Sequence, residues 1–241
     1  MQRAGVHLVE IGIPFSDPIA EGPTIQHASE TALRNGSAPS VVACLEQLET
    51  ARKLGFSLPV LLMGYANSFL NFDPPSTLAT LLQAHAVSGV IIVDLPPEES
   101  GPLRGALRSA GVSYVPLIAP TTTPHRVKSL LAAADSFAYC VSVTGVTGTR
   151  TSNDVDLPEY LARVREHCAE NVYVAVGFGV GSASQFGEVA EMADGVVIGS
   201  AIIKMVDAKV KEMEARGDAL EGDAAAKEVG GAVEAWCREV A

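Results

Sequence analysis

A glutamate within an apolar, strand-length run is the first residue of this sequence that could do chemistry. Glu10 lies in the run at 7–11, His-Leu-Val-Glu-Ile. Burying an unpaired carboxylate is costly. If the side chain points into the protein interior, its pKa should rise, which suits a group that shuttles protons. The alternative is a structural glutamate held in a salt bridge.

The segment that follows carries three prolines and two more acids, Asp17 and Glu21. It is predicted to be a long loop. Such a loop either covers a substrate or forms a rigid surface turn, and its composition alone leaves both interpretations open.

Glycines near the ends of two later apolar runs suggest a site for an anion. Gly179, Gly199 and Ser200 follow these runs closely. Glycine lets the backbone approach a phosphate, and a helix N-terminus directs N–H groups at it. Each glycine taken singly could instead serve a turn, but their positions at consecutive strand ends favour a phosphate clamp.

No metal or covalent cofactor is predicted. The five histidines are not at metal-ligand spacings, and no lysine stands where a Schiff base would form. The four cysteines are widely spaced without a C-x-x-C pair, which predicts reduced thiols in a cytoplasmic protein.

Composition narrows the class of protein further. The chain has 241 residues, 48% of them hydrophobic and 5% aromatic, and a formal net charge of −11. Nucleic-acid binding needs a clustered basic face, which this sequence lacks. No apolar run reaches the roughly 18 residues that span a bilayer. The negative net charge does not prevent the binding of a phosphorylated metabolite, because backbone amides can bind phosphate.

Alternation of short apolar runs with amphipathic stretches predicts an α/β fold. The expected strands are at 7–11, 60–63, 90–94, 114–119, 137–143, 172–177 and 195–199. Helices are expected from an N-cap at Ser37 to near Gly55, from Pro97 to Gly111, and over 157–167 and 182–192. This order predicts parallel strands with right-handed crossovers.

About seven such units without a long break favour a (β/α)8 TIM-type barrel over an open doubly wound sheet. Residues 1–5 read as the last turn of a helix ending at a glycine, so a preceding βα unit is expected to be missing. We therefore predict a single domain over 1–241 that is N-terminally incomplete, with a terminal helix or tail at 218–241.

An ordered set of motifs makes the chain resemble the tryptophan synthase alpha family. The family string L-E-x-G-x-P-F-S-D-P-x-A-D-G-P-T-I-Q matches residues 9–26 at all but one of its specified positions, with Val9 counted as conservative. Further matches, in order, are Leu62-Met63-Gly64-Tyr65-Ala66-Asn67, Val93-Asp94-Leu95-Pro96-Pro97-Glu98-Glu99, Pro116-Leu117-Ile118-Ala119-Pro120-Thr121, Thr144-Gly145-Val146-Thr147-Gly148, Gly177-Phe178-Gly179-Val180 and Gly199-Ser200-Ala201-Ile202.

The resemblance implies a lyase that cleaves indole-3-glycerol phosphate to indole and glyceraldehyde 3-phosphate in tryptophan biosynthesis. Glu10 occupies the position of the family's general acid–base, which protonates indole C3. Glu21 stands where the family has an aspartate that accepts the indole N–H. The extra methylene moves this carboxylate by roughly 1.3–1.5 Å, and a misplacement of that size can reduce a rate about 10²-fold.

Further site residues follow from the same resemblance. Gly148 would add a phosphate contact, and Thr147, in a long polar loop over 144–156, would bond a catalytic carboxylate. Many family members have an arginine in place of Val143. The residues at family positions that line the indole pocket or flank the catalytic carboxylate are Leu62, Ile91, Tyr139 and Phe178, with Tyr65 and Asp94 behind them. Without the resemblance, core packing is the better explanation of the first four.

The resemblance also implies a partner, the tryptophan synthase beta subunit, which carries pyridoxal phosphate. The segments 14–18 and 65–72 would face it. Gly64 and the Val143-Thr144-Gly145 sequence resemble eukaryotic versions, in which alpha and beta are often fused. Two alternatives stay open: an impaired, truncated barrel that binds or modulates the beta subunit, and another phosphate-binding barrel such as an epimerase or isomerase.

Overall fold

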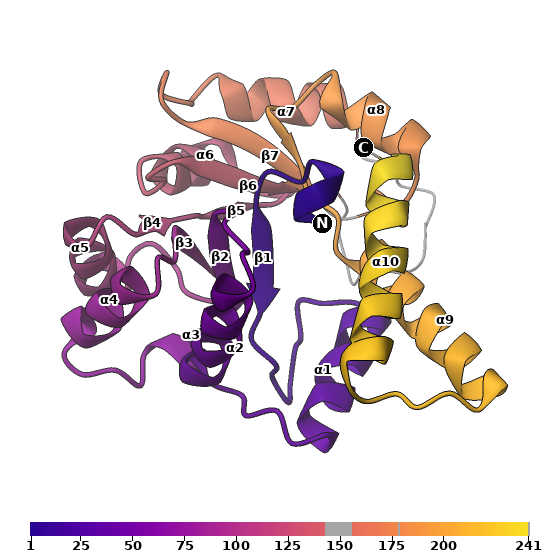
Figure 1. The fold of residues 1–241 in the computed structure, drawn as a ribbon. Helices are drawn as coiled ribbons and strands as arrows, with labels where there is room; N and C mark the ends of the chain where they lie inside the picture. Colours follow the sequence, from indigo (N-terminus) through magenta and orange to yellow (C-terminus); the bar gives the residue numbers. More distant parts are fainter. Residues whose placement is uncertain (143–155, 178, 241) are drawn as a thin grey trace.

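The computed structural model describes residues 1–142, 156–177 and 179–240 (Figure 1). Its strands are β1 (Val9–Gly12), β2 (Val60–Gly64), β3 (Gly89–Ile92), β4 (Ser113–Tyr114), β5 (Leu117–Ile118), β6 (Phe137–Val141), β7 (Tyr173–Gly177) and β8 (Gly195–Val196). Its helices are η1 (Gln2–Ala4, a 3₁₀ helix), α1 (Pro23–Arg34), α2 (Val41–Lys53), α3 (Ala66–Phe69), α4 (Pro75–Ala84), α5 (Gly101–Ser109), α6 (Pro124–Leu131), α7 (Leu157–Arg165), α8 (Ala183–Ala190), α9 (Ser200–Arg216) and α10 (Asp223–Val240).

The strands form two parallel sheets in the orders β1-β2-β3-β4 and β5-β6-β7-β8. The expected strand at 114–119 is divided between them at Val115-Pro116, because Pro116 has no N–H to donate. The segment still joins both sheets: the Val115 amide donates to the Val90 carbonyl at 3.0 Å, and the Tyr139 amide donates to the Pro116 carbonyl at 2.9 Å. The predicted α/β barrel architecture is confirmed, with seven strand positions among the described residues.

Two helix starts differ from the sequence-based expectation. The cap of α2 is Ser40 rather than Ser37, since its side chain accepts a hydrogen bond from the Ala43 amide at 3.2 Å. Helix α5 begins at Gly101 rather than at Pro97. Residues 96–100 form a separate turn, in which the Ser100 amide donates to the Pro96 carbonyl at 3.1 Å.

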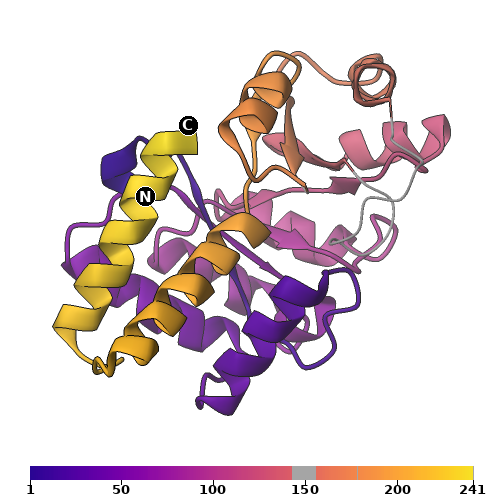
Figure 2. The ribbon, with the colours of Figure 1, turned by 90° about the vertical axis from the view of Figure 1, so that its right-hand side faces the viewer.

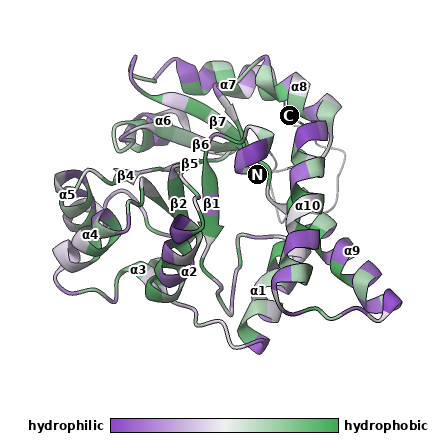
Figure 3. Ribbon diagram, in the orientation of Figure 1, coloured by the Kyte–Doolittle hydropathy of each residue, from purple (hydrophilic) through white to green (hydrophobic). Residues whose placement is uncertain are grey.

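Three hydrophobic clusters divide the interior. One lies between β1–β4 and helices α2, α4 and α5, and a second lies between β5–β8 and helices α6, α7 and α8. The third lies inside the barrel and is centred on Leu61, Ile91, Val115 and Tyr139. Figure 3 shows the corresponding hydropathy, with hydrophobic colour along the strands and mixed colour on the helices. Inner strands are thus apolar on both faces, as parallel strands covered by helices should be.

The two ends of the chain meet on one side of the barrel. Helix α10 packs against η1, α8 and α9, while α1 packs against α9 (Figure 2). The Arg3 guanidinium lies 2.7 Å from the Glu234 carboxylate, which ties η1 to α10. The helix expected at 218–241 is α10, and Gly5 ends η1 with a positive φ of 85°. In the described part of the chain, no helix is long and apolar enough to cross a membrane.

Candidate active site

Glu10 lies in β1, and its side chain belongs to the barrel interior. It pairs in register with Leu61 of β2, a member of the interior cluster. Burial, together with the nearby negative charge of Glu21, raises the pKa of the Glu10 carboxyl from 4.5 to about 7. At neutral pH this carboxyl can therefore both release and accept a proton, as an acid–base group must.

Glu21 lies at the end of the loop that joins β1 to α1, directly before the Gly22 cap. Its side chain is only 9% exposed. The hydroxyl of Tyr65 donates a hydrogen bond to its carboxylate, and the Ala20 amide donates to the same hydroxyl oxygen at 2.9 Å. Burial raises the pKa of Glu21, the Tyr65 hydrogen bond opposes that rise, and the negative charge of Asp94 adds to it. The Tyr65 hydroxyl thus holds this buried carboxylate in one position.

The carboxyl ends of three neighbouring strands bring these groups together. Tyr65 follows β2 and stacks on Phe15 of the first loop, with ring centroids 4.8 Å apart. Asp94 follows β3, and its carboxylate accepts a hydrogen bond from the Ala66 amide at 2.6 Å, at the start of α3. Barrel enzymes place their active sites at this end of the strands.

Tyr139 reaches the same interior from the far sheet. It lies in β6, is 5% exposed, and its pKa is raised by burial and by the negative charge of Glu10. Gly177 of β7 leaves the space that the ring occupies, because a Cβ there would overlap the Tyr139 hydroxyl and lie 2.7 Å from a ring carbon. In the sequence, Gly177 stands out only as part of the motif Gly177-Phe178-Gly179-Val180. A glycine ending an apolar strand was the available signal for this close approach.

Leu62 does not lie where it was expected. Its side chain is fully buried in the helix-facing cluster, on the outer side of β2. Leu61 and Met63 face the barrel interior instead, because successive side chains of a strand point to opposite faces. Ile91 does face the interior, as a member of its cluster. Phe178 lies outside the described residues.

The glycines of the expected phosphate clamp follow the last two strands. Gly179 comes after β7 and has a positive φ of 88°, whereas Gly199 caps α9, whose first residue is Ser200. A Cβ at Gly179 or Gly199 would meet no atom within 4 Å, so both backbones border open space. A 17-residue helix starting at Ser200 directs its free amides toward that space. Thr147 and Gly148 lie outside the described residues.

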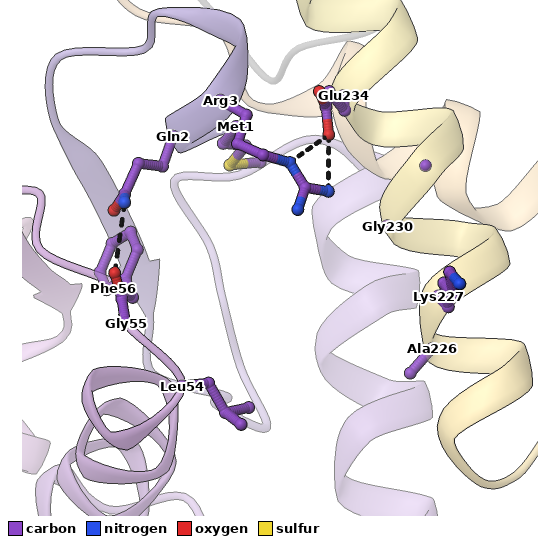
Figure 4. A pocket seen from close by; sticks show the side chains of 11 residues that line it. Met1, Gln2, Arg3, Leu54, Gly55, Phe56, Ala226, Lys227, Gly230 and Glu234 are labelled. Atoms are coloured by element: carbon purple, nitrogen blue, oxygen red, sulfur yellow. Dashed lines mark hydrogen bonds and ion pairs between the residues drawn. The ribbon is translucent and has the colours of Figure 1, made fainter.

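A surface cavity lies elsewhere on the barrel. It measures about 340 Å³ and is lined by residues of η1, α10 and the segment 54–56 (Figure 4). These elements precede β1 and β2, so the cavity opens at the amino ends of the strands. The carboxylates lie toward the opposite end. Geometry and charge therefore assign the candidate active site to the carboxylate group rather than to this cavity.

Fold and site define a TIM-type (β/α) barrel that carries two carboxylates, the buried Glu21 and the half-buried Glu10, toward the carboxyl ends of its strands. Residues 1–230 match the family model described as tryptophan synthase alpha chain. The chain is 41% identical over 208 residues to the tryptophan synthase alpha chain of Caulobacter sp. strain K31, covering 86% of this chain and 74% of that one. It also matches a solved chain of the tryptophan synthase a2b2 complex of Pyrococcus furiosus with a TM-score of 0.79 and 31% identity, covering 97% of this chain and 86% of the other.

The chain belongs to the tryptophan synthase alpha chain family. It is a lyase of tryptophan biosynthesis, of the type that cleaves indole-3-glycerol phosphate. The alternative of an epimerase or isomerase barrel is thereby wrong. Tryptophan synthase of Saccharomyces cerevisiae is 45% identical over 204 residues, but the chain spans only 28% of that protein's length and 85% of its own.

Proposed function

We propose that Glu10 is the acid–base group of this lyase. The observation that carries the proposal is a carboxyl with a pKa of about 7 inside the barrel. Protonated Glu10 gives its proton to indole C3. The C3–C3′ bond then breaks, and its electron pair restores the aromatic ring. The Glu10 carboxylate, now without its proton, accepts the proton of the hydroxyl on C3′ as the aldehyde of glyceraldehyde 3-phosphate forms, so the protons balance.

Glu21 is the group that accepts the indole N–H. Protonation at C3 places positive charge on the ring nitrogen, and a nearby carboxylate stabilises that charge most strongly in a water-poor site. The Tyr65 hydroxyl and the turn at Ala20 fix the longer glutamate side chain. This support favours a working carboxylate despite the departure from the family aspartate.

The remaining substrate contacts are proposed from the positions of the described residues and from the family resemblance. Tyr139 and Ile91, together with the inward-facing Leu61 and Met63, form the apolar wall that suits an indole ring. Backbone amides at Gly179, Gly199 and Ser200 bind the phosphate, with Gly148 as an additional contact. By family resemblance, Thr147 bonds a catalytic carboxylate and Phe178 lines the pocket.

The partner we propose is a tryptophan synthase beta subunit or a fused beta domain, which receives indole. The segments 14–18 and 65–72 contribute to a small surface depression of about 160 Å³ lined in part by Phe15, Ser16 and Asn67. Pyridoxal phosphate belongs to that partner, and the acid–base chemistry above needs no cofactor in this chain. A cytoplasmic location fits the four free cysteines.

Indole release from indole-3-glycerol phosphate tests these roles. The chain is compared with Glu10→Gln and Glu21→Asp, each with and without a beta subunit. Glu10→Gln should abolish indole formation, since an amide cannot exchange this proton. Glu21→Asp should raise it, since the aspartate restores the family geometry.

Circular dichroism and thermal unfolding provide the control that each variant is folded. Indole formation that survives Glu10→Gln would show that Glu10 is not the acid–base group. No indole from the folded, unsubstituted chain, even with a beta subunit present, would instead favour the impaired barrel that only modulates beta. The observation that favours this alternative is that β1 and β8 do not pair with each other among the described residues.

A further inference from the structure

The segment that directly follows β3 holds the turn that carries Tyr65. The Val93 amide donates a hydrogen bond to the Gly64 carbonyl at 3.0 Å. The carboxylate of Asp94, the next residue, accepts a hydrogen bond from the Ala66 amide at 2.6 Å. Gly64 and Ala66 are the two neighbours of Tyr65 in the chain. The Tyr65 backbone is therefore fixed on both of its sides by two consecutive residues of one segment.

This segment has an anchor of its own on β4. The Tyr114 hydroxyl donates a hydrogen bond to the Leu95 carbonyl at 3.1 Å. Tyr114 is 2% exposed and Leu95 is 6% exposed, so the bond lies in the interior, where hydrogen bonds are stronger than in water. Asp94, one residue before Leu95, is exposed. Packing does not hold the Asp94 carboxylate, so its position depends on the backbone that Tyr114 fixes.

The Tyr114 residue is itself held firmly. Its amide donates to the Asp135 carboxylate at 3.0 Å, and the residue pairs in register with Val90 of β3. The Arg104 guanidinium lies over the ring, 5.6 Å from its centroid. The hydroxyl is therefore presented from a fixed ring on a fixed strand. A group that positions another must have its own conformation locked in this way.

We propose that Tyr114 is a positioning residue for the Glu21 carboxylate. Its hydroxyl fixes the Leu95 carbonyl and, with it, the adjoining Asp94 carboxylate. That carboxylate caps the turn from which Tyr65 donates to Glu21. Strands β2, β3 and β4 are neighbours in the sheet, so the contacts run from β4 across β3 and β2 to the loop after β1 (Figure 1). The effect on turnover rests on the proposed function of Glu21, whereas the positioning itself does not.

Titration of the Glu21 carboxyl by 13C NMR tests the positioning directly. Tyr114→Phe removes the hydroxyl and keeps the ring. It should raise the pKa of Glu21, because a loosened Tyr65 hydrogen bond lowers that pKa less. The charge of Asp94 raises the same pKa, so an Asp94 carboxylate that only moved away would lower it. A lower or unchanged pKa of Glu21 would overturn the route through Tyr65.

A double-mutant cycle with Tyr65→Phe tests whether Tyr114 acts through Tyr65. Tyr65→Phe alone should raise the pKa of Glu21 more than Tyr114→Phe does. In the Tyr65→Phe chain, adding Tyr114→Phe should change this pKa no further, because the contact through which it acts is already absent. Additive shifts would overturn the proposal.

Exchange of the Ala66 amide with solvent reports the intermediate contact. Tyr114→Phe should speed this exchange at least threefold, and exchange of the Val93 amide, which donates directly to Gly64, is the internal reference. Asp94→Ala, at an exposed residue, breaks the same series of contacts without altering the core, and should speed exchange at Ala66 more. An unchanged rate at Ala66 in Tyr114→Phe would overturn the proposal.

Tyr160→Phe is the matched control. Tyr160 is also 2% exposed, and its hydroxyl donates to a strand carbonyl of the other sheet, that of Ile118, at 2.7 Å. This variant loses a comparable buried hydrogen bond, so its loss of stability should be similar. It should leave the pKa of Glu21 and the exchange of Ala66 unchanged. Equal effects in the two variants would show general loosening of the fold and overturn the proposal.

Steady-state kinetics then connect the positioning to turnover. Tyr114→Phe should lower kcat for indole release about 2–10-fold, the range expected for one neutral hydrogen bond, with KM nearly unchanged. The double variant with Tyr65→Phe should have the kcat of Tyr65→Phe alone.

Failure of this inference and failure of the proposed function give different results. A raised pKa of Glu21 and faster exchange at Ala66 in Tyr114→Phe would support the positioning even if no substitution of Glu21 changed indole release; that result would refute the catalytic role of Glu21. A kcat lowered by Tyr65→Phe, with no effect of Tyr114→Phe on pKa or exchange, would keep the role of Glu21 and overturn the positioning by Tyr114.

Discussion

The hydroxyl of Tyr65 donates a hydrogen bond to the carboxylate of Glu21, so a residue that follows β2 fixes an acid that follows β1. Tyr65 is itself held by stacking on Phe15 and by the Ala20 amide. A carboxylate that is one methylene longer than the family aspartate can reach more positions, and this contact selects one of them. The relationship explains how the chain can retain a working carboxylate at this place.

Tyr65→Phe should therefore lower kcat more than it raises KM. The variant removes a hydrogen bond to a charged group, whose loss typically costs about 1.5–3 kcal/mol, or roughly a 10–100-fold change. It should also raise the pKa of Glu21, which the hydroxyl now lowers. Steady-state kinetics of indole release and a 13C NMR titration of the carboxyl measure both effects. Equal kcat values in the two proteins would argue against a positioning role.

The pH dependence of the reaction should report Glu10. Proton delivery to C3 needs the protonated carboxyl, so kcat/KM should fall as pH rises through about 7. Because the substrate phosphate also titrates near this range, 13C NMR of the Glu10 carboxyl provides the direct reading. In Glu21→Gln the midpoint should move to lower pH, since a neighbouring negative charge is gone. A midpoint that stays in place would show that Glu21 does not influence Glu10.

Glu10→Gln should stabilise the fold at high pH. The carboxyl has a raised pKa in the folded chain, so between about 4.5 and 7 the folded state holds a proton that the unfolded state has released. The free energy of unfolding of the unsubstituted chain therefore falls as pH rises through this window and levels off above it. At pH 8 the variant should gain up to roughly 3 kcal/mol. Near pH 4 the two should be similar.

Urea unfolding at several pH values measures this difference. The matched control is Glu46→Gln, on the exposed face of α2, which should leave the free energy of unfolding nearly unchanged at each pH. A Glu10→Gln variant that is no more stable than the unsubstituted chain at pH 8 would contradict the burial of a charged Glu10 carboxylate.

Gly177→Ala should disturb the site through Tyr139. The added methyl would overlap the tyrosine ring, and overpacking of this kind costs about 1–3 kcal/mol. A double-mutant cycle with Tyr139→Leu measures the coupling, and the pair should be less destabilised than the sum of the single variants. Additive effects would show that the two residues do not compete for the same space. Gly105→Ala, where a Cβ meets no atom within 4 Å, is the control.

The amino-acid sequence by itself determined the chemistry-bearing residues and the class of fold. Glu10 stands out because a carboxylate inside an apolar strand is costly, and the ordered motifs around Glu21, Tyr65 and Gly199 point to one family. Alternating apolar runs were enough for a parallel α/β barrel, because buried parallel strands are short and almost continuously apolar.

Only the tertiary structure decided which side of each strand faces the interior. Leu61 and Leu62 are the same residue type in adjacent positions, so no pattern could tell the barrel face from the helix face. The contacts between Tyr65 and Glu21 and between Tyr139 and Gly177 join residues of different strands and loops. Such contacts depend on how distant segments come together, which local sequence does not encode.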